Sequence, residues 1–133
     1  MTRALSTSVV LLTLTCSTAG AQTQAQLTES AARAARRADS TLNALYSQLE
    51  QRYASDTLAL RKLRAAQHAW LAYREAEIEA AYPATDKQQY GSVIGMCMAS
   101  LRSDITDARV NELRRRLSSL ANEGDVCAGG PVQ

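Results

Sequence analysis

Several polar residues in this sequence recur at the spacing of otherwise apolar helix faces. A buried charge must find a partner, because an unpaired one is strongly destabilising. The pattern therefore predicts either a hydrogen-bonded network that fixes helix register or the lining of a binding groove. In the network, Asp39 would pair with Arg74 or Arg109, and Asn43 and Gln67 would complete it. We favour the structural interpretation, because polar networks in helical bundles more often specify packing than bind ligands.

Catalytic chemistry is hard to assemble from the remaining residues. The one histidine, His68, falls beside the apolar stripe of its helix, which indicates a surface or boundary position. A single histidine in that position does not supply the base of a Ser-His-acid or Cys-His catalytic set. Glu75 and Glu79 stand at helical spacing, as do Asp104 and Asp107, but they lack histidine or cysteine partners for a metal. We therefore expect no enzyme, no bound metal and no cofactor.

The charge balance argues against nucleic-acid binding. The chain has 15 Lys and Arg residues against 13 Asp and Glu residues, a formal net charge of +2. The dense basic run at 114–116 and the looser one at 33–37 are the only concentrations of positive charge, and both fit solvated helix faces.

The first 21 residues have the order of a secretory signal peptide. A single charge, Arg3, precedes an apolar stretch at 9–14 and a small-residue run that ends at Ala21. Serines and threonines interrupt the stretch, so a lasting membrane span of about 20 apolar residues is not expected. We predict cleavage after Ala21 and release of residues 22–133, one domain with flexible ends, to the periplasm or the exterior. Lipoprotein modification at Cys16 is the disfavoured alternative, because the residues before it do not fit that signal.

Cleavage would leave two cysteines, Cys97 and Cys127, in a compartment where disulfides persist. We expect them to pair. Closing a loop of about 30 residues would contribute roughly 3–4 kcal/mol if the bond is unstrained. The alternative is two separate thiols, with Cys97 buried and Cys127 on a loose tail.

Hydrophobic periodicity predicts an all-α fold, a small antiparallel bundle of three main helices. The first would start near Thr28, capped by Thr28 or Ser30, after a frayed segment at 22–27. The second would run from a cap at Ser55 or Asp56 to Pro83, and the third from Ser92, with a kink possible at 103–107. The residues expected on the buried faces are Ala35, Ala38, Leu42, Leu45, Leu49 and Tyr53; Leu60, Leu63, Gln67, Trp70, Arg74 and Ile78; and Ile94, Cys97, Leu101, Ile105, Ala108, Leu113, Leu117 and Leu120.

These runs resemble, in order and spacing, the lysozyme inhibitor LprI-like family of bacterial exported proteins. The centre of the resemblance is Gln-x-x-Trp-x-x-Tyr-Arg at 67–74, followed by Thr-x-x-Arg-x-x-x-Leu at 106–113, and the resemblance covers about residues 30–120. The family usually has a cysteine where Ile78 stands, so its disulfide pattern cannot be copied, and Cys127 remains as the mate for Cys97. The motif residues are Asp39, Asn43, Tyr46, Gln67, Trp70, Tyr73, Arg74, Thr106, Arg109 and Leu113.

The resemblance implies stoichiometric binding to a lysozyme. Such enzymes are basic and carry two carboxylates in a cleft, so an inhibitor should offer an acidic face or an inserted side chain. The alternative is an accessory or structural module of the envelope that binds another protein or a cell-wall fragment. Exposed rings at Trp70 and Tyr73 would favour that alternative, and a fully buried Trp70 would oppose it. The candidate partner-binding residues are Glu75, Glu77, Glu79 and Asp86.

Overall fold

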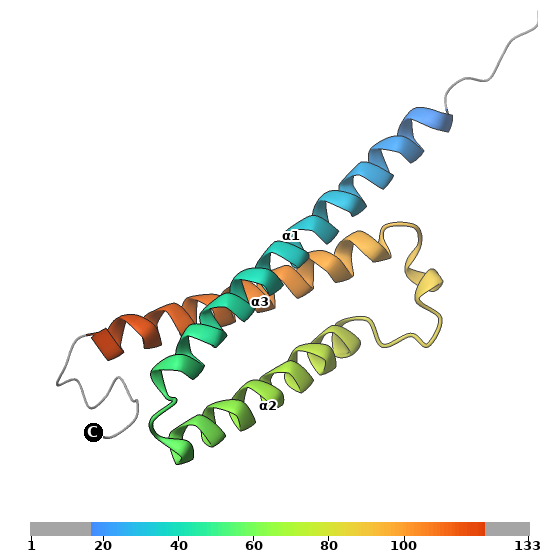
Figure 1. Cartoon of the computed structure of the whole chain (residues 1–133). Helices are drawn as coiled ribbons and strands as arrows, with labels where there is room; N and C mark the ends of the chain where they lie inside the picture. The colour runs from blue at the N-terminus through green and yellow to red at the C-terminus, as the bar shows by residue number, and fades with distance from the viewer. Residues whose placement is uncertain (1–16, 122–133) are drawn as a thin grey trace, which may run out of the picture.

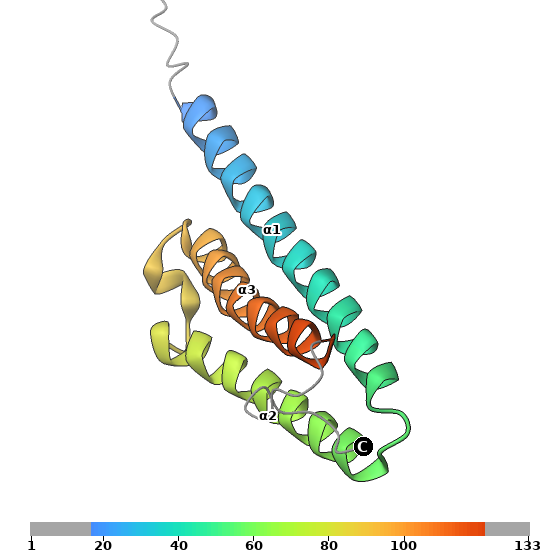
Figure 2. The same ribbon diagram turned by 90° about the vertical axis from the view of Figure 1, so that its left-hand side faces the viewer.

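Three helices and one short 3-10 helix make up the fold. The computed structural model describes residues 17–121, and side-chain environments within 23–120. Consecutive long helices run antiparallel, so the first and third run in the same direction (Figures 1 and 2). Within the described range there is no strand, and the predicted all-α bundle is confirmed. The elements are α1 (Ser17–Arg52), α2 (Thr57–Ala81), η1 (Lys87–Tyr90) and α3 (Ile94–Ala121).

The bounds of α2 follow from its sequence as predicted. The carboxylate of Asp56 accepts hydrogen bonds from the backbone N–H groups of Leu58 and Ala59, at 3.0 and 2.9 Å, and so caps the first turn. The helix ends at Ala81, just before Tyr82 and Pro83, because proline lacks the N–H and clashes with the preceding turn. Local signals are sufficient to place both ends of this helix.

The first helix begins earlier than predicted. Thr28 and Ser30 lie inside α1 and cap nothing, and the Thr28 hydroxyl instead donates to the Gln24 carbonyl at 3.0 Å. No proline or glycine lies between Ala21 and Thr28, so nothing there stops the helix from extending toward the N-terminus. The N-terminal part of α1 consequently projects beyond the other helices (Figure 1), and the expected cleavage site lies within its bounds.

The core lies between α1 and α3, whose backbones approach closely along much of their length (Figure 2). α3 runs without interruption through 103–107, so the kink left open by the sequence is not present. Ala108 is exposed, contrary to expectation, because the buried face of α3 is centred on Thr106, Val110 and Leu113. The core cluster consists of Leu42, Leu49, Tyr53, Leu63, Val110 and Leu113, with Leu45, Tyr46, Ala59, Leu60, Trp70, Leu117 and Leu120 packed against it.

The second helix stands farther from the other two and is joined to them by long side chains. Its buried residues are Leu63, Gln67, Arg74 and Ile78, so two aliphatic residues flank two polar ones. Ile78 is almost completely buried. α2 therefore packs on the bundle through a layer that is polar at its centre. No helix in the part of the chain described here is long and apolar enough to cross a membrane.

Candidate functional site

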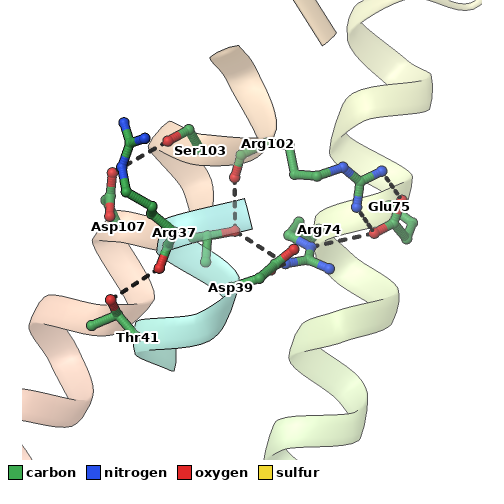
Figure 3. Close-up of polar contacts among 9 residues, drawn as sticks. Arg37, Asp39, Thr41, Arg74, Glu75, Arg102, Ser103 and Asp107 are labelled. Carbon is green, nitrogen blue, oxygen red and sulfur yellow. Dashed lines mark hydrogen bonds and ion pairs between the residues drawn. The ribbon is translucent and has the colours of Figure 1, made fainter. Parts of the chain in front are cut away.

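Arg74 is the centre of a polar layer that joins all three helices. Its side chain, on α2, is only 9% exposed. Nη1 donates to Oδ1 of Asp39 on α1 at 2.6 Å and to Oγ1 of Thr106 on α3 at 3.0 Å. The predicted pair therefore forms, and Arg74 rather than Arg109 is the partner of Asp39 (Figure 3). Because one guanidinium bridges three helices, their relative rotation and register are fixed together.

Thr106 is fully buried and uses its hydroxyl in both directions. The oxygen accepts from Arg74, while the hydroxyl hydrogen is donated to the Arg102 carbonyl of the same helix at 2.7 Å. A threonine supplies both roles in one small side chain. The hydroxyl of Thr106, one of the motif residues, is therefore fully used in hydrogen bonds within the protein.

A second arginine extends the layer along α3. Nε and Nη2 of Arg109 donate to Oε1 of Gln67 on α2, at 3.4 and 3.2 Å, and Nη1 donates to Glu112 at 2.7 Å. Both guanidiniums contact the ring of half-buried Trp70, whose centroid lies 5.2 Å from the guanidinium carbon of Arg74 and 5.8 Å from that of Arg109. Two cation–π contacts on one indole add to the stability of the layer.

Not every motif residue belongs to the layer. Asn43 is exposed and takes part in no hydrogen bond within the range described, so the expectation that it completes the network is wrong. Asp39, one helical turn before it, already lies at the edge of the layer with a side chain 39% exposed, and the helix turns Asn43 farther outward. Leu113 is fully buried in the core, whereas Tyr73 is 52% exposed on the outside of α2.

Tyr46 lies half-buried against the core near the α1–α2 turn. Burial raises the pKa of its phenol, and the neighbouring carboxylate of Glu50 raises that pKa further. The phenol is therefore held in its neutral form, which suits a packing residue.

An ion pair that the sequence analysis missed closes the outer side of the layer. Glu75 accepts two hydrogen bonds from Arg102, at 2.5 and 2.6 Å, and one from Nε of Arg74 at 3.3 Å. The bonds from Arg102 hold the pKa of the Glu75 carboxyl below its ordinary value, against the opposing effect of burial. Figure 3 shows Asp39, Arg74, Glu75 and Arg102 as a row of contacting side chains whose negative and positive charges alternate. Arg102 precedes Thr106 by one turn, and this spacing is the signal that could have revealed it.

The predicted acidic patch carries less free charge than its four acids suggest. Glu75 is paired as above, and Glu79 accepts from the Lys87 ammonium at 2.7 Å. Asp86 caps η1 by accepting from the backbone N–H of Gln88 at 2.9 Å. Glu77 is exposed and has no ion pair with any residue of the described range. It is therefore the acid of this group best placed to meet another molecule.

A shallow groove lies where α1 passes the start of α3. The single carboxylate in it, Glu29, accepts from Arg33 at 3.2 Å and from Arg36 at 2.8 Å, and so is already paired. The groove offers no acid and base set for proton transfer. Its lining residues are Gln24, Ala25, Thr28, Glu29 and Ser92.

The polar layer is complete in itself. Every buried side-chain nitrogen and oxygen within the described residues has a hydrogen-bond partner. No cluster of three or more His, Cys, Asp or Glu side chains suited to a metal occurs in the same part of the chain. The arrangement therefore fits a device that holds helices in register. Cys97 is half-buried at the start of α3, and its predicted mate, Cys127, lies outside the described residues.

These features define the chain as a small three-helix bundle organised around a buried polar layer. Comparison with known protein families matches residues 16–113 to the lysozyme inhibitor LprI family. The chain belongs to that family. Searches of curated proteins and of solved structures found no match. The whole polar layer lies inside the matched range, whereas Cys127 lies beyond it.

Proposed function

We propose that this protein is exported and inhibits a lysozyme by stoichiometric binding, without catalysing a reaction. The family match, over residues 16–113, is the observation that carries the proposal. The use of the buried polar groups in internal bonding is consistent with it, because a reaction would need a reactive group held ready at a site.

The proposed contact surface is the exposed flank of the second half of α2 that carries Tyr73 and Glu77. Glu77 is exposed and unpaired within the range described, and Tyr73, one turn earlier on the same ridge, is likewise exposed. Aromatic rings are enriched at protein interfaces, and an acid next to one suits a basic enzyme. Glu75 and Glu79, each two residues from Glu77, lie on the opposite side of α2, where Arg102 and Lys87 pair them.

Export would follow from a signal peptide at residues 1–21, with cleavage after Ala21. The mature chain would then begin with Gln22, and α1 with it, in the periplasm or outside the cell. N-terminal sequencing of protein recovered from the envelope fraction tests this step. A chain that begins at Met1, or one that is lipid-modified at Cys16, would contradict it.

Inhibition itself is tested by titrating the purified mature protein against lysozymes of several types in a cell-wall lysis assay. The rate of lysis should fall in proportion to added protein and reach its floor near one-to-one stoichiometry. Glu77→Lys should weaken inhibition. Asp104→Lys is the matched control, because Asp104 is also exposed and unpaired in the described range but lies on α3.

Unchanged lysis at molar excess would reject the proposal. An accessory module of the envelope, binding another protein or a wall fragment, would then take its place. In that case Tyr73 would be the ring available for stacking on a ligand, because Arg74 and Arg109 already contact the ring of Trp70.

A further inference from the structure

The two connections between the long helices differ in length. Residues 53–56 join α1 to α2, whereas residues 82–93 join α2 to α3. Both pairs of helices are antiparallel, so the first connection shows that four residues are enough to reverse the chain (Figures 1 and 2). Connections between the helices of bundles usually have about two to eight residues. The segment 82–93, called here the α2–α3 connector, is therefore longer than the fold requires.

The α2–α3 connector adds nothing to the core. None of residues 82–93 is buried, and the exposed fractions of Tyr90 and Val93 are 37% and 39%. In Figure 1 the connector lies at the end of the bundle opposite the α1–α2 turn. Ordering a chain segment costs conformational entropy, which burial in the core does not offset here. The connector must therefore be held in place by contacts of its own.

Two tyrosines and a lysine hold the base of the connector. The rings of Tyr82 and Tyr90 meet edge to face, with their centroids 5.5 Å apart. The phenol oxygen of Tyr90 accepts a hydrogen bond from the backbone N–H of Ala84 at 3.1 Å. The ammonium of Lys87 donates both to the carbonyl of Tyr82 and to the carboxylate of Glu79 on α2. These contacts tie the connector to itself and to the end of α2.

A capped turn fixes the exposed part of the connector. Asp86 caps the start of η1, and the backbone N–H of Gly91 donates to the carbonyl of Gln88 at 2.8 Å where η1 ends. Gly91 has a φ of 79°, which glycine adopts without steric cost. The side chains of Gln88 and Gln89 are exposed and make no hydrogen bond with any residue that the structure describes. The connector thus combines a fixed backbone with free side chains.

The exposed surface of the connector is mainly uncharged. Its only charged residues, Asp86 and Lys87, are used in the contacts that order it. Loops that bind proteins are rich in tyrosine, serine, glycine and asparagine, because rigid rings and adaptable polar groups suit a protein surface. The connector has the same kind of composition, with glutamine in place of asparagine. Its exposed residues include Thr85, Gln88, Gln89, Tyr90, Ser92 and Val93.

We infer that the α2–α3 connector is the centre of the contact with a partner protein and, resting on the proposed function, that this partner is the lysozyme. Glu77 lies about 6 Å along α2 from Ala81, so the connector begins close to the flank that carries Tyr73 and Glu77. Protein interfaces have a centre depleted of charge and a polar rim. The connector fits the centre, and Glu77 fits the rim. Because the connector is already ordered, binding through it loses little further entropy.

Replacing Gln88 and Gln89 together by alanine tests the contact. The bonds that order the connector do not use these side chains, so the fold should not change. The dissociation constant for a lysozyme that the wild type inhibits should rise about tenfold, measured by isothermal titration calorimetry. The matched control combines Gln48→Ala with Gln51→Ala, two exposed glutamines of α1 near the opposite end of the bundle, and should leave the constant unchanged.

Gly91→Ala tests the fixed backbone separately from the side chains. A Cβ at this position would meet no atom within 4 Å, so the substitution acts through the strained φ alone. Affinity for the lysozyme should fall about fivefold, because the connector must then be ordered during binding. The free energy of unfolding should change little, since the connector lies outside the core. Unchanged affinity would contradict binding through a pre-ordered connector.

The outcomes separate this inference from the proposed function. If the wild type inhibits a lysozyme and the double-glutamine variant binds that enzyme as tightly, the inhibitor function stands and the connector contact is wrong. Equal losses of affinity in this variant and in its control would also overturn the contact. If the wild type inhibits no lysozyme, the proposed function fails, and the contact fails with it.

Discussion

Replacing Arg74 by alanine is the sharpest test of the polar layer. The side chain is buried and donates hydrogen bonds to Asp39 and Thr106 while lying over Trp70. A hydrogen bond to a charged group contributes about 1.5–3 kcal/mol net, and a desolvated cation–π contact about 1–2 kcal/mol. Removing one member of a fully buried ion pair costs about 3–5 kcal/mol. Asp39, however, is partly exposed and can be rehydrated, so we expect a loss of about 3 kcal/mol.

Denaturant unfolding followed by circular dichroism measures this loss. Asp39→Asn keeps the shape and an acceptor oxygen but removes the charge, and should cost about 1 kcal/mol. In the double variant the two losses should fall short of their sum by about 1 kcal/mol, because the interaction is removed only once. Arg33→Ala is the control and should change stability little, since Arg33 is exposed and, among the described residues, pairs only with Glu29 on its own helix.

Two outcomes would refute the reasoning. If the free-energy losses of the Arg74 and Asp39 variants simply add, the two residues are not partners. If Arg74→Ala costs under about 1 kcal/mol, the polar layer contributes little to stability, and its residues would have to be explained by binding.

Three further predictions concern Glu75, Glu77 and the two cysteines. Because the pKa of Glu75 is lowered in the folded protein, this residue stabilises the fold above about pH 4.5, and the stabilisation is lost as the pH falls through the folded pKa. The difference in free energy of unfolding between wild type and Glu75→Gln should therefore become smaller in acid. A difference that stays constant with pH in denaturant titrations would contradict this. Glu77→Lys should slow association with a basic lysozyme, measured by stopped flow, and the association rate of the wild type should fall as salt rises. An association rate that Glu77→Lys leaves unchanged would exclude this contact. Cys97 lies about 36 Å along α3 from Ala121. The roughly six residues from Ala121 to Cys127 can reach at most about 20 Å, which is too short to join the two cysteines. The predicted disulfide therefore requires the last turn of α3 to unwind. Non-reducing peptide mapping should find that bond within one chain, and a disulfide-linked dimer on a non-reducing gel would contradict it.

The sequence by itself determined the helical class and much of the local structure. Helical periodicity gave three helices, and Asp56 and Pro83 placed the ends of the second, because capping and proline exclusion act within a few residues. The sequence also indicated that Asp39 needs a partner, because a charge on a buried helix face requires one. The start of the first helix was misplaced because threonine and serine occur inside helices as well as at caps.

Which side chains meet was decided only by the tertiary structure. Arg74 and Arg109 were equally eligible to pair with Asp39, and the rotation of α2 against α1 and α3 selected Arg74. The same rotation left Asn43 exposed and brought Glu75 to Arg102, across 27 positions of sequence. Periodicity assigns a residue to a face of its own helix. The angle and register between helices are set by the packing of all three together, and no local pattern contains that information.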